Sequence, residues 1–304
     1  MPPPSPGPGE DLEPLARALE ADERYRVLRR FEPRSRYAAD DGSPVALALA
    51  VDVETTGLDS RTDRIIQLAI LPFTYGRDSG LVHAVSAPLV WLEDPGRPIP
   101  PEITDLTGLT DADVAGQRID DAAVAAAVSD SALVIAHNAE FDRGFLERRL
   151  PLFRDRPWAC SAREVPWRRL GFSSSSLEFL LIRACGLFYG AHRADQDCAA
   201  LVHLLATPLP DERPALWHLL QSARAKSHRI WAIDAPFDLK ELLKARKYRW
   251  SGGEEGRPRA WHREVPEADS PAELAWLQAN IYGGRKGPWR IDTLDARSRY
   301  SDRS

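Results

Sequence analysis

Cysteine, long apolar runs and lysine are all scarce in this 304-residue chain. The three cysteines (Cys160, Cys185 and Cys198) include no C-x-x-C pair, which argues against a disulfide framework and a structural zinc site. We therefore expect reduced thiols and a cytoplasmic protein. No run of 18 apolar residues occurs, so we expect no membrane span. The first nine residues, nearly all Pro, Ser and Gly, lack the features of a signal peptide and indicate a disordered tail.

Charge is divided unevenly along the chain, although the net charge is only −5. All five lysines lie after residue 225. Residues 222–304 carry 17 of the 40 basic and 12 of the 45 acidic residues, a net +5, which leaves a net −10 for residues 1–221. This shift indicates a domain boundary near 210–226 and suits an acidic metal-binding unit beside a polyanion-binding unit. Chance patchiness in an Arg-rich chain is the alternative.

Apolar patterning predicts an α/β architecture. Residues 45–53 form a continuous apolar run between Gly-Ser-Pro and Thr-Thr-Gly, as is typical of a strand buried on both faces. Further strands are expected at 64–73, 81–90, 132–136 and 158–160, and helices at 11–31, 122–128, 141–150, 177–186 and 195–206. Strands that first form a meander and then alternate with helices favour a mixed β-sheet with helices on its faces.

After Pro210 the pattern changes to that of a small α+β unit. A helix is expected at 216–224, a strand at 229–235, a basic helix at 239–246, a hairpin over 248–264, and a last helix at 270–282 before a polar tail.

Acidic side chains gather at the end of the first strand. Asp52 and Glu54 are two residues apart, so in a strand they point to the same face. Carboxylates at a strand end place hard oxygen ligands where open α/β sheets bind their ligands. The backbone N–H groups of the following Thr-Thr-Gly turn could meet a phosphate. A solvated strand end or a helix cap is the alternative for this pair taken alone.

Two later clusters have a similar setting. His137-Asn138-Ala139-Glu140-Phe141-Asp142 follows the 132–136 strand directly, and Asn138 could simply cap the next helix. His192-Arg193-Ala194-Asp195-Gln196-Asp197 opens the 195–206 helix, where Asp195 could act as a cap.

Together the three clusters resemble the three exonuclease motifs of the DEDDh superfamily, the group that holds ribonuclease T and bacterial polymerase proofreading subunits. The first motif is Asp52-Val53-Glu54-Thr55-Thr56-Gly57, and the other two are the His137 and His192 clusters. The resemblance covers about residues 45–206 and implies a ribonuclease H-like mixed sheet flanked by helices.

The resemblance also implies roles for individual residues. Asp52 would bridge two divalent cations, Glu54 and Asp197 would complete the first site, and Asp142 would hold the second ion. Carboxylate ligands favour Mg²⁺ or Mn²⁺. His192 would be the general base, because imidazole titrates near neutrality; His137 is the competing candidate. The terminal nucleotide would be bound by Thr55, Thr56, Leu58, Asn138 and Phe141.

The C-terminal unit mixes basic and aromatic side chains, which bind phosphates and stack on unpaired bases. The candidate nucleic-acid contacts are Lys244, Arg246, Lys247, Tyr248, Arg249 and Trp250. The alternative is that Tyr248, Trp250 and Trp261 form the core of a unit too small to build one otherwise.

We therefore predict a tail and helix (1–43), an exonuclease domain (44–208), a linker (209–226) and a basic module (227–304). The predicted function is a metal-dependent 3′→5′ exonuclease that acts on single-stranded DNA ends. The alternatives are an exoribonuclease, a binding or proofreading subunit within a DNA polymerase or repair complex, and a catalytically inactive scaffold. No membrane partner is expected, and the oligomeric state is left open.

Overall fold

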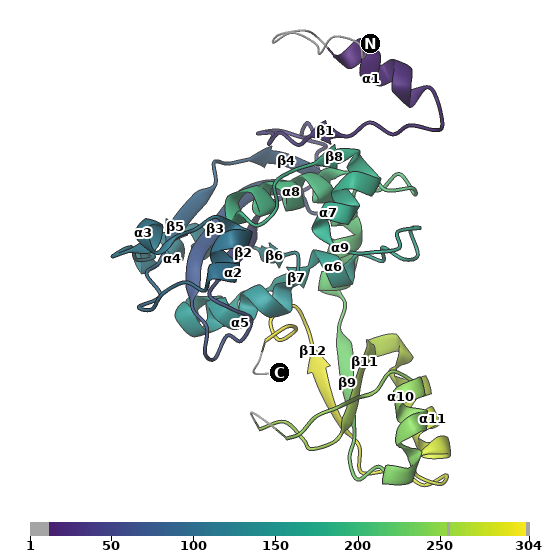
Figure 1. The fold of residues 1–304 in the computed structure, drawn as a ribbon. Coiled ribbons are helices and arrows are strands. Elements are labelled where there is room, and N and C mark those ends of the chain that lie inside the picture. Colours follow the sequence, from purple (N-terminus) through teal and green to yellow (C-terminus); the bar gives the residue numbers. More distant parts are fainter. Residues whose placement is uncertain (1–11, 254–255, 302–304) are drawn as a thin grey trace.

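The computed structural model describes residues 12–253 and 256–301. A six-stranded sheet with its helices forms the main domain (residues 45–224), and a four-stranded sheet forms the C-terminal module (residues 227–294), as Figure 1 shows. All three cysteines are free. Within the described ranges, no helix combines the length and apolar character that a membrane crossing requires.

The larger sheet is mixed, as predicted. Its strand order is β4-β3-β2-β6-β7, and β5 also pairs with β3. The strands are β2 (Val45–Thr55), β3 (Ile65–Gly76), β4 (Val82–Val85), β5 (Leu89–Leu92), β6 (Leu133–Ala136) and β7 (Trp158–Cys160). β3 runs antiparallel to β2, β4 and β5, whereas β2, β6 and β7 are parallel. The strand expected at 81–90 is divided in two next to Pro88, which has no N–H to give to a ladder.

Alternate residues of β2 enter two separate cores, one on each face of the sheet. Leu49, Val51 and Val53 pack with side chains of α4 (Asp121–Ser129) and α5 (Ala139–Arg149). Ala48 and Ala50 pack on the other face with α7 (Leu177–Leu180), α8 (Ala194–Ala206) and α9 (Ala215–Arg224). The sheet is thus buried on both faces, as its continuous apolar runs predict. The shorter helices are α2 (Pro101–Thr107), α3 (Asp111–Val114) and α6 (Ser161–Glu164).

The N-terminal helix is much shorter than predicted. Helix α1 covers only Glu13–Glu20 and buries none of its residues; Leu15 is 60% exposed. Without a packing partner, a short helix gains little stability. The chain is then extended, and β1 (Arg29–Arg30) pairs in parallel with β8 (Leu187–Phe188). The helix prediction over 21–31 is therefore wrong.

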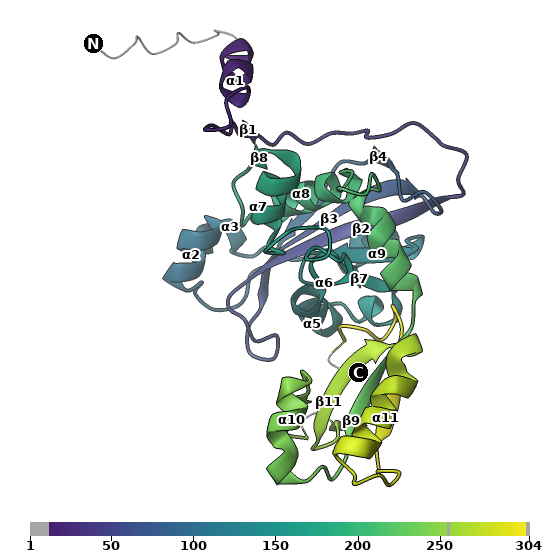
Figure 2. The ribbon, with the colours of Figure 1, turned by 90° about the vertical axis from the view of Figure 1, so that its right-hand side faces the viewer.

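The C-terminal module has the strand order β10-β11-β9-β12. Its strands are β9 (Ser227–Ala232), β10 (Arg249–Trp250), β11 (Trp261–Pro266) and β12 (Arg290–Leu294), and its helices are α10 (Lys240–Ala245) and α11 (Ser270–Asn280). Figure 2 shows both helices beside this sheet. Strand β12 lies in the segment that the sequence predicted to be a polar tail.

The residues after β12 return to the main domain, and we call residues 295–301 the C-terminal clasp. The Ala296 carbonyl accepts a hydrogen bond from the Trp158 backbone N–H at the edge of β7. Arg299 is 6% exposed, forms an ion pair with Glu164 and donates to the Ala225 carbonyl. The clasp thus ties the C-terminal module to the main domain a second time.

The clasp also contacts helix α5. Arg143, which is fully buried, donates to the carbonyls of Arg297 and Arg299 and pairs with Glu147. Ser301 donates to the second oxygen of Glu147.

Candidate active site

Three of the predicted carboxylates converge at the end of strand β2. One oxygen each of Asp52, Glu54 and Asp197 lies within 4.8 Å of the others. The first two are on one face of β2, and Asp197 comes from the first turn of α8, which packs on that face. Such a group of oxygens can hold a hard divalent cation.

Asp142 lies beside this group. It is on the first turn of α5, which follows β6, the parallel neighbour of β2. One of its oxygens accepts a hydrogen bond from the Val53 backbone N–H at 3.2 Å, and the residue is only 3% exposed. Because β2 and β6 run in parallel, their ends bring the first two motifs together.

The cluster is electrostatically unfavourable without a counter-charge. Burial, and then repulsion from the neighbouring carboxylates, raises the pKa of Asp52 well above its ordinary value. The same causes raise the pKa of Glu54 to about 7, and burial chiefly raises the pKa of Asp142 to about 7. The main causes include no lysine or arginine charge. A bound cation would supply the missing positive charge, so the donor set fits a divalent metal.

Two residues that sequence reasoning missed position the Asp197 side of the cluster. The Tyr189 hydroxyl donates to Asp197 at 2.6 Å, and burial followed by the Asp197 charge raises the pKa of this tyrosine. Gln67 on β3 accepts a hydrogen bond from the Ala194 backbone N–H at the start of α8. Neither residue belongs to a motif, and nothing in the local sequence distinguishes it.

His192 stands in the loop before α8 with a positive φ of 69° and an exposed side chain. A non-glycine residue in this region of the backbone is uncommon and marks strain that a site can use. The charge of His192 is among the influences that lower the pKa of Asp197, whose overall shift is upward because of burial. The imidazole is therefore close enough to the cluster to affect it.

His137, the competing candidate for the general base, forms hydrogen bonds within the fold through both of its ring nitrogens. Its Nε2 lies 2.7 Å from the Ser175 carbonyl and its Nδ1 lies 2.8 Å from the Ser161 hydroxyl. A carbonyl can only accept, so Nε2 carries the proton and Nδ1 accepts from the serine. Burial lowers the pKa of His137 to about 4. The ring is thus neutral and holds the 161 and 175 segments together.

The predicted substrate residues in the turn after β2 differ in exposure: some side chains are buried in the turn and others are exposed. Thr56 is 3% exposed, and its hydroxyl contacts Arg97 at 2.6 Å and Asp63 at 3.3 Å. The Thr56 side chain thus stabilises the turn, and a substrate contact of Thr56, which stays a prediction, would be made by its backbone. Thr55 donates to the Gly57 carbonyl, whereas Leu58 is 85% exposed beside the site.

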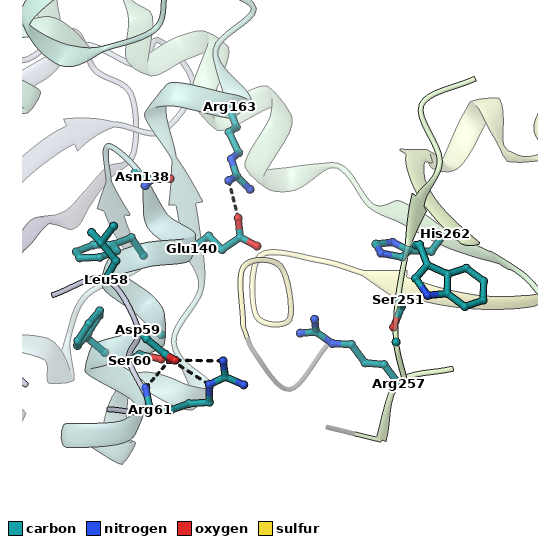
Figure 3. A pocket seen from close by; sticks show the side chains of 15 residues that line it. Leu58, Asp59, Ser60, Arg61, Asn138, Glu140, Arg163, Ser251, Arg257 and His262 are labelled. Atoms are coloured by element: carbon teal, nitrogen blue, oxygen red, sulfur yellow. Dashed lines mark hydrogen bonds and ion pairs between the residues drawn. The ribbon is translucent and has the colours of Figure 1, made fainter. Parts of the chain in front are cut away.

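Asn138 and Phe141 line a cleft of about 760 Å³ together with Leu58 (Figure 3). Asn138 is at the N-cap position of α5, but its side chain makes no capping hydrogen bond. The capping alternative is thus not supported, and the amide faces the cleft.

The predicted nucleic-acid contacts in the C-terminal module also differ in exposure. Tyr248 is 3% exposed and donates to Glu273, so the core alternative holds for it and its predicted role as a nucleic-acid contact is wrong. Arg246 is paired with the same glutamate. Trp250, in contrast, is 51% exposed and lines the cleft. Lys244, Lys247 and Arg249 are exposed.

The chain is similar in sequence to bacterial DNA polymerase III proteins. The chain is 26% identical over 188 residues to the DNA polymerase III subunit epsilon of Treponema pallidum, covering 58% of this chain and 82% of that one. It is 31% identical over 126 residues to a PolC-type DNA polymerase III of Clostridium perfringens, covering 38% of this chain. The chain spans only 8% of the length of that polymerase.

Solved structures of exonucleases are similar in part. Exonuclease X in complex with 5′-overhanging duplex DNA is 26% identical, with a TM-score of 0.37 over 51% of this chain and 88% of that one. The E. coli exonuclease I–ssDNA complex is 16% identical, with a TM-score of 0.45 over 73% and 63%. The model of the RNase_T exonuclease family matches residues 49–205, which include Asp52, Asp142 and Asp197. Since this match covers just over half of the 304 residues, the chain belongs to the RNase_T exonuclease family.

Proposed function

We propose that the protein is a 3′→5′ exonuclease that releases nucleoside monophosphates from the 3′ ends of single-stranded DNA with the help of two divalent cations. The convergence of Asp52, Glu54 and Asp197 within 4.8 Å, with Asp142 beside them, is the observation that carries this proposal. The family match supports nuclease chemistry, and the DNA substrate and the direction of cleavage belong to the proposal.

The four carboxylates would hold the cations. All donors are carboxylate oxygens, so Mg²⁺ or Mn²⁺ suits the site better than a soft metal. When bound, two such ions stabilise negative charge on the attacking and departing oxygens of a phosphodiester. The charges of Asp142, Asp197 and Glu54 all act on Asp52, so this carboxylate would be among the residues that hold the cations.

His192 would accept the proton of the attacking water. Its exposed position on the loop before α8 lets the imidazole pass the proton on to solvent. Tyr189 would keep one oxygen of Asp197 in a fixed orientation through its 2.6 Å hydrogen bond. His137 is a positioning residue in this scheme, because both of its ring nitrogens already have partners.

The terminal nucleotide would lie against Leu58, Asn138 and Phe141, which line the cleft and are close in sequence to Glu54 and Asp142. None of the four carboxylates is itself among the residues that line this cleft. Thr55 would contribute through its backbone, since its hydroxyl is bonded to Gly57. Among the module residues, Trp250 and the exposed cations Lys244, Lys247 and Arg249 remain the proposed nucleic-acid contacts.

The test is nucleotide release from matched single-stranded DNA and RNA 20-mers labelled at either end, with Mg²⁺, Mn²⁺ or EDTA. The expected result is a metal-dependent ladder from 5′-labelled DNA and immediate mononucleotide release from 3′-labelled DNA, both lost in Asp52→Asn. Faster trimming of RNA would assign the enzyme to RNA processing. Failure to cleave either strand would refute the proposal and would direct attention to a binding role within a polymerase complex.

A further inference from the structure

Helix α1 presents an apolar face that stays open in the described part of the chain. Leu12, Leu15 and Leu19 recur at helical spacing and are 49%, 60% and 37% exposed. Figures 1 and 2 both show α1 standing away from the main domain. A helix of eight residues is marginal in water, because helices in proteins are stabilised mainly by packing of their apolar face. The leucine face of α1 is therefore suited to a contact that a single molecule does not make.

Another side of α1 is tied to the main domain through one arginine. The Arg29 guanidinium donates to both oxygens of Glu13 and to both oxygens of Glu20, at 2.8–3.1 Å. The backbone of Arg29 is itself fixed, because its N–H donates to the Gly186 carbonyl next to β8. These ion pairs engage a different side of the helix from the leucines. They hold α1 in place and leave its leucine face free.

A second apolar surface lies on the main domain. It is a hollow of about 430 Å³ between residues 33–37, residues 85–88, Leu71 on β3 and one side of α8, and we call it the α8 groove. No part of residues 12–253 or 256–301 fills it. Contiguous apolar surface that is open to solvent marks an interaction site. The apolar part of its lining includes Tyr37, Leu71, Val85, Ala87 and Val202.

The volume of the α8 groove matches the leucine face of α1. The cavity left by one leucine side chain is about 150 Å³, so the groove has room for roughly three leucines. Within one molecule, the ion pairs of Arg29 hold α1 beside β1, whereas the groove begins only at Pro33. The helix would have to break these pairs to enter its own groove. Entry by the α1 of another copy leaves them intact.

Charges near the two surfaces are complementary. Arg34 lines the groove, is exposed and forms no ion pair with any described residue. Glu23, just after α1, is also exposed and likewise has no ion-pair partner within the described ranges. An ion pair between two such exposed side chains adds little affinity, but it fixes the orientation of a docked helix.

We propose that two copies of the chain form a symmetric dimer in which each α1 lies in the α8 groove of the other copy. A reciprocal exchange of this kind closes on itself, so association stops at two copies. The contact is small, and we expect a dissociation constant of about 1–100 µM. This inference does not depend on the nuclease function. Asp195 and Gln196 line the groove, so each docked α1 would lie against the helix that carries Asp197.

The experiment is sedimentation velocity of the full chain from about 1 to 200 µM, a range that spans the expected dissociation constant. The wild type should shift from monomer to dimer as its concentration rises. The α1 variant, Leu15→Glu/Leu19→Glu, should weaken the dimer by roughly 100-fold or more, because both contacts would then bury charges. The groove variant, Ala87→Glu, changes an exposed lining residue and should weaken the dimer in the same way.

A mixture of the two variants tests the exchange directly. The α1 variant keeps a wild-type groove, and the groove variant keeps a wild-type α1. A mixed pair therefore has one intact contact, whereas each variant paired with itself has none. The equimolar mixture should associate more strongly than either variant alone.

The matched control is Leu106→Glu/Leu242→Glu, which places two charges at other exposed leucines, 49% and 47% exposed. This variant should associate like the wild type. Leu15→Met/Leu19→Met should also keep the dimer, because methionine preserves both the apolar face and the helix. Agreement of the two controls separates loss of the leucine face from a general effect of surface charge or unfolding.

The outcomes are distinct. A wild type that stays monomeric over the whole range would overturn the proposal, and this includes the case in which α1 fills the groove of its own molecule. A dimer that is lost in the α1 variant but kept in Ala87→Glu would show two α1 helices packed on each other and would overturn the groove assignment. A mixture that associates no better than its components would overturn the exchange.

Discussion

Replacement of Arg143 by methionine should severely destabilise the protein although this residue touches no substrate. Its guanidinium is fully buried, pairs with Glu147 and donates to the carbonyls of Arg154, Arg297 and Arg299. Methionine preserves much of the side-chain volume but makes none of these hydrogen bonds. The Glu147 carboxylate, 5% exposed, would then lose its ion pair with Arg143 while it remains buried.

The expected cost follows from these contacts. Breaking a buried ion pair by removing one partner costs about 3–5 kcal/mol. Each carbonyl that loses its donor adds on the order of 1 kcal/mol, and the contributions are not additive. We expect a loss of roughly 4–5 kcal/mol in the free energy of unfolding, a large part of a typical domain's stability. At about 2–4 °C per kcal/mol for a protein of 150–250 residues or somewhat more, Tm should fall by roughly 8–20 °C.

Urea and thermal unfolding of Arg143→Met measure this loss. Arg148→Met is the control, because Arg148 is on the same helix but exposed, and surface substitutions usually change stability by about 0.5 kcal/mol or less. Deletion of the clasp from residue 295 onward should cost a similar amount, and the double variant little more, because both changes remove the same contacts. A loss below about 1 kcal/mol, or full additivity, would refute this account of the clasp.

Three further predictions concern the active site. His192→Ala should lower kcat by about 100-fold or more, with partial rescue by added imidazole; unchanged kcat would remove His192 from the mechanism. Tyr189→Phe should weaken Mg²⁺ binding by about 10- to 100-fold, measured by calorimetry, because Asp197 loses the hydrogen bond that orients it. The raised pKa values of Glu54 and Asp142, about 7, mean that the cation-free folded state binds protons more tightly than the unfolded state. Their contribution to stability is full below about pH 4 and is lost as the pH rises through about 7, so Mg²⁺ should raise Tm more at pH 8 than at pH 5; equal shifts would contradict the assignment.

The convergence of the carboxylates could be predicted because these residues lie in short segments that follow apolar strands. Asp52 and Glu54 end the continuous apolar run of β2, and Asp142 follows β6 after a short turn. Local periodicity fixes the faces of a strand, and the parallel pairing of β2 with β6 brings both ends to one place. The mixed sheet followed from the same runs.

The parts that could not be predicted depend on partners far away in the sequence. In the sequence, Arg299 looks like part of a polar tail, because buried arginines are rare. Its burial depends on partners such as Glu164, which lies 135 residues earlier. Tyr248 sits among basic residues, and only the fold shows that its hydroxyl meets Glu273. Helix α1 has good local spacing but no surface to pack on, so the pattern predicted a helix longer than the one that forms.

The contacts of the clasp also determine when parts of the main domain can finish folding during synthesis. Arg143 and the carbonyl of Arg299 are 156 residues apart. At about 5–20 residues per second, synthesis of the intervening chain takes roughly 8–30 s. Throughout this interval, water must take the place of the Arg297 and Arg299 carbonyls as hydrogen-bond acceptor for the Arg143 guanidinium. The Trp158 N–H at the edge of β7 likewise lacks its acceptor, the Ala296 carbonyl. Helix α5, which carries Asp142, therefore reaches its final surroundings only after the module beside it has been made.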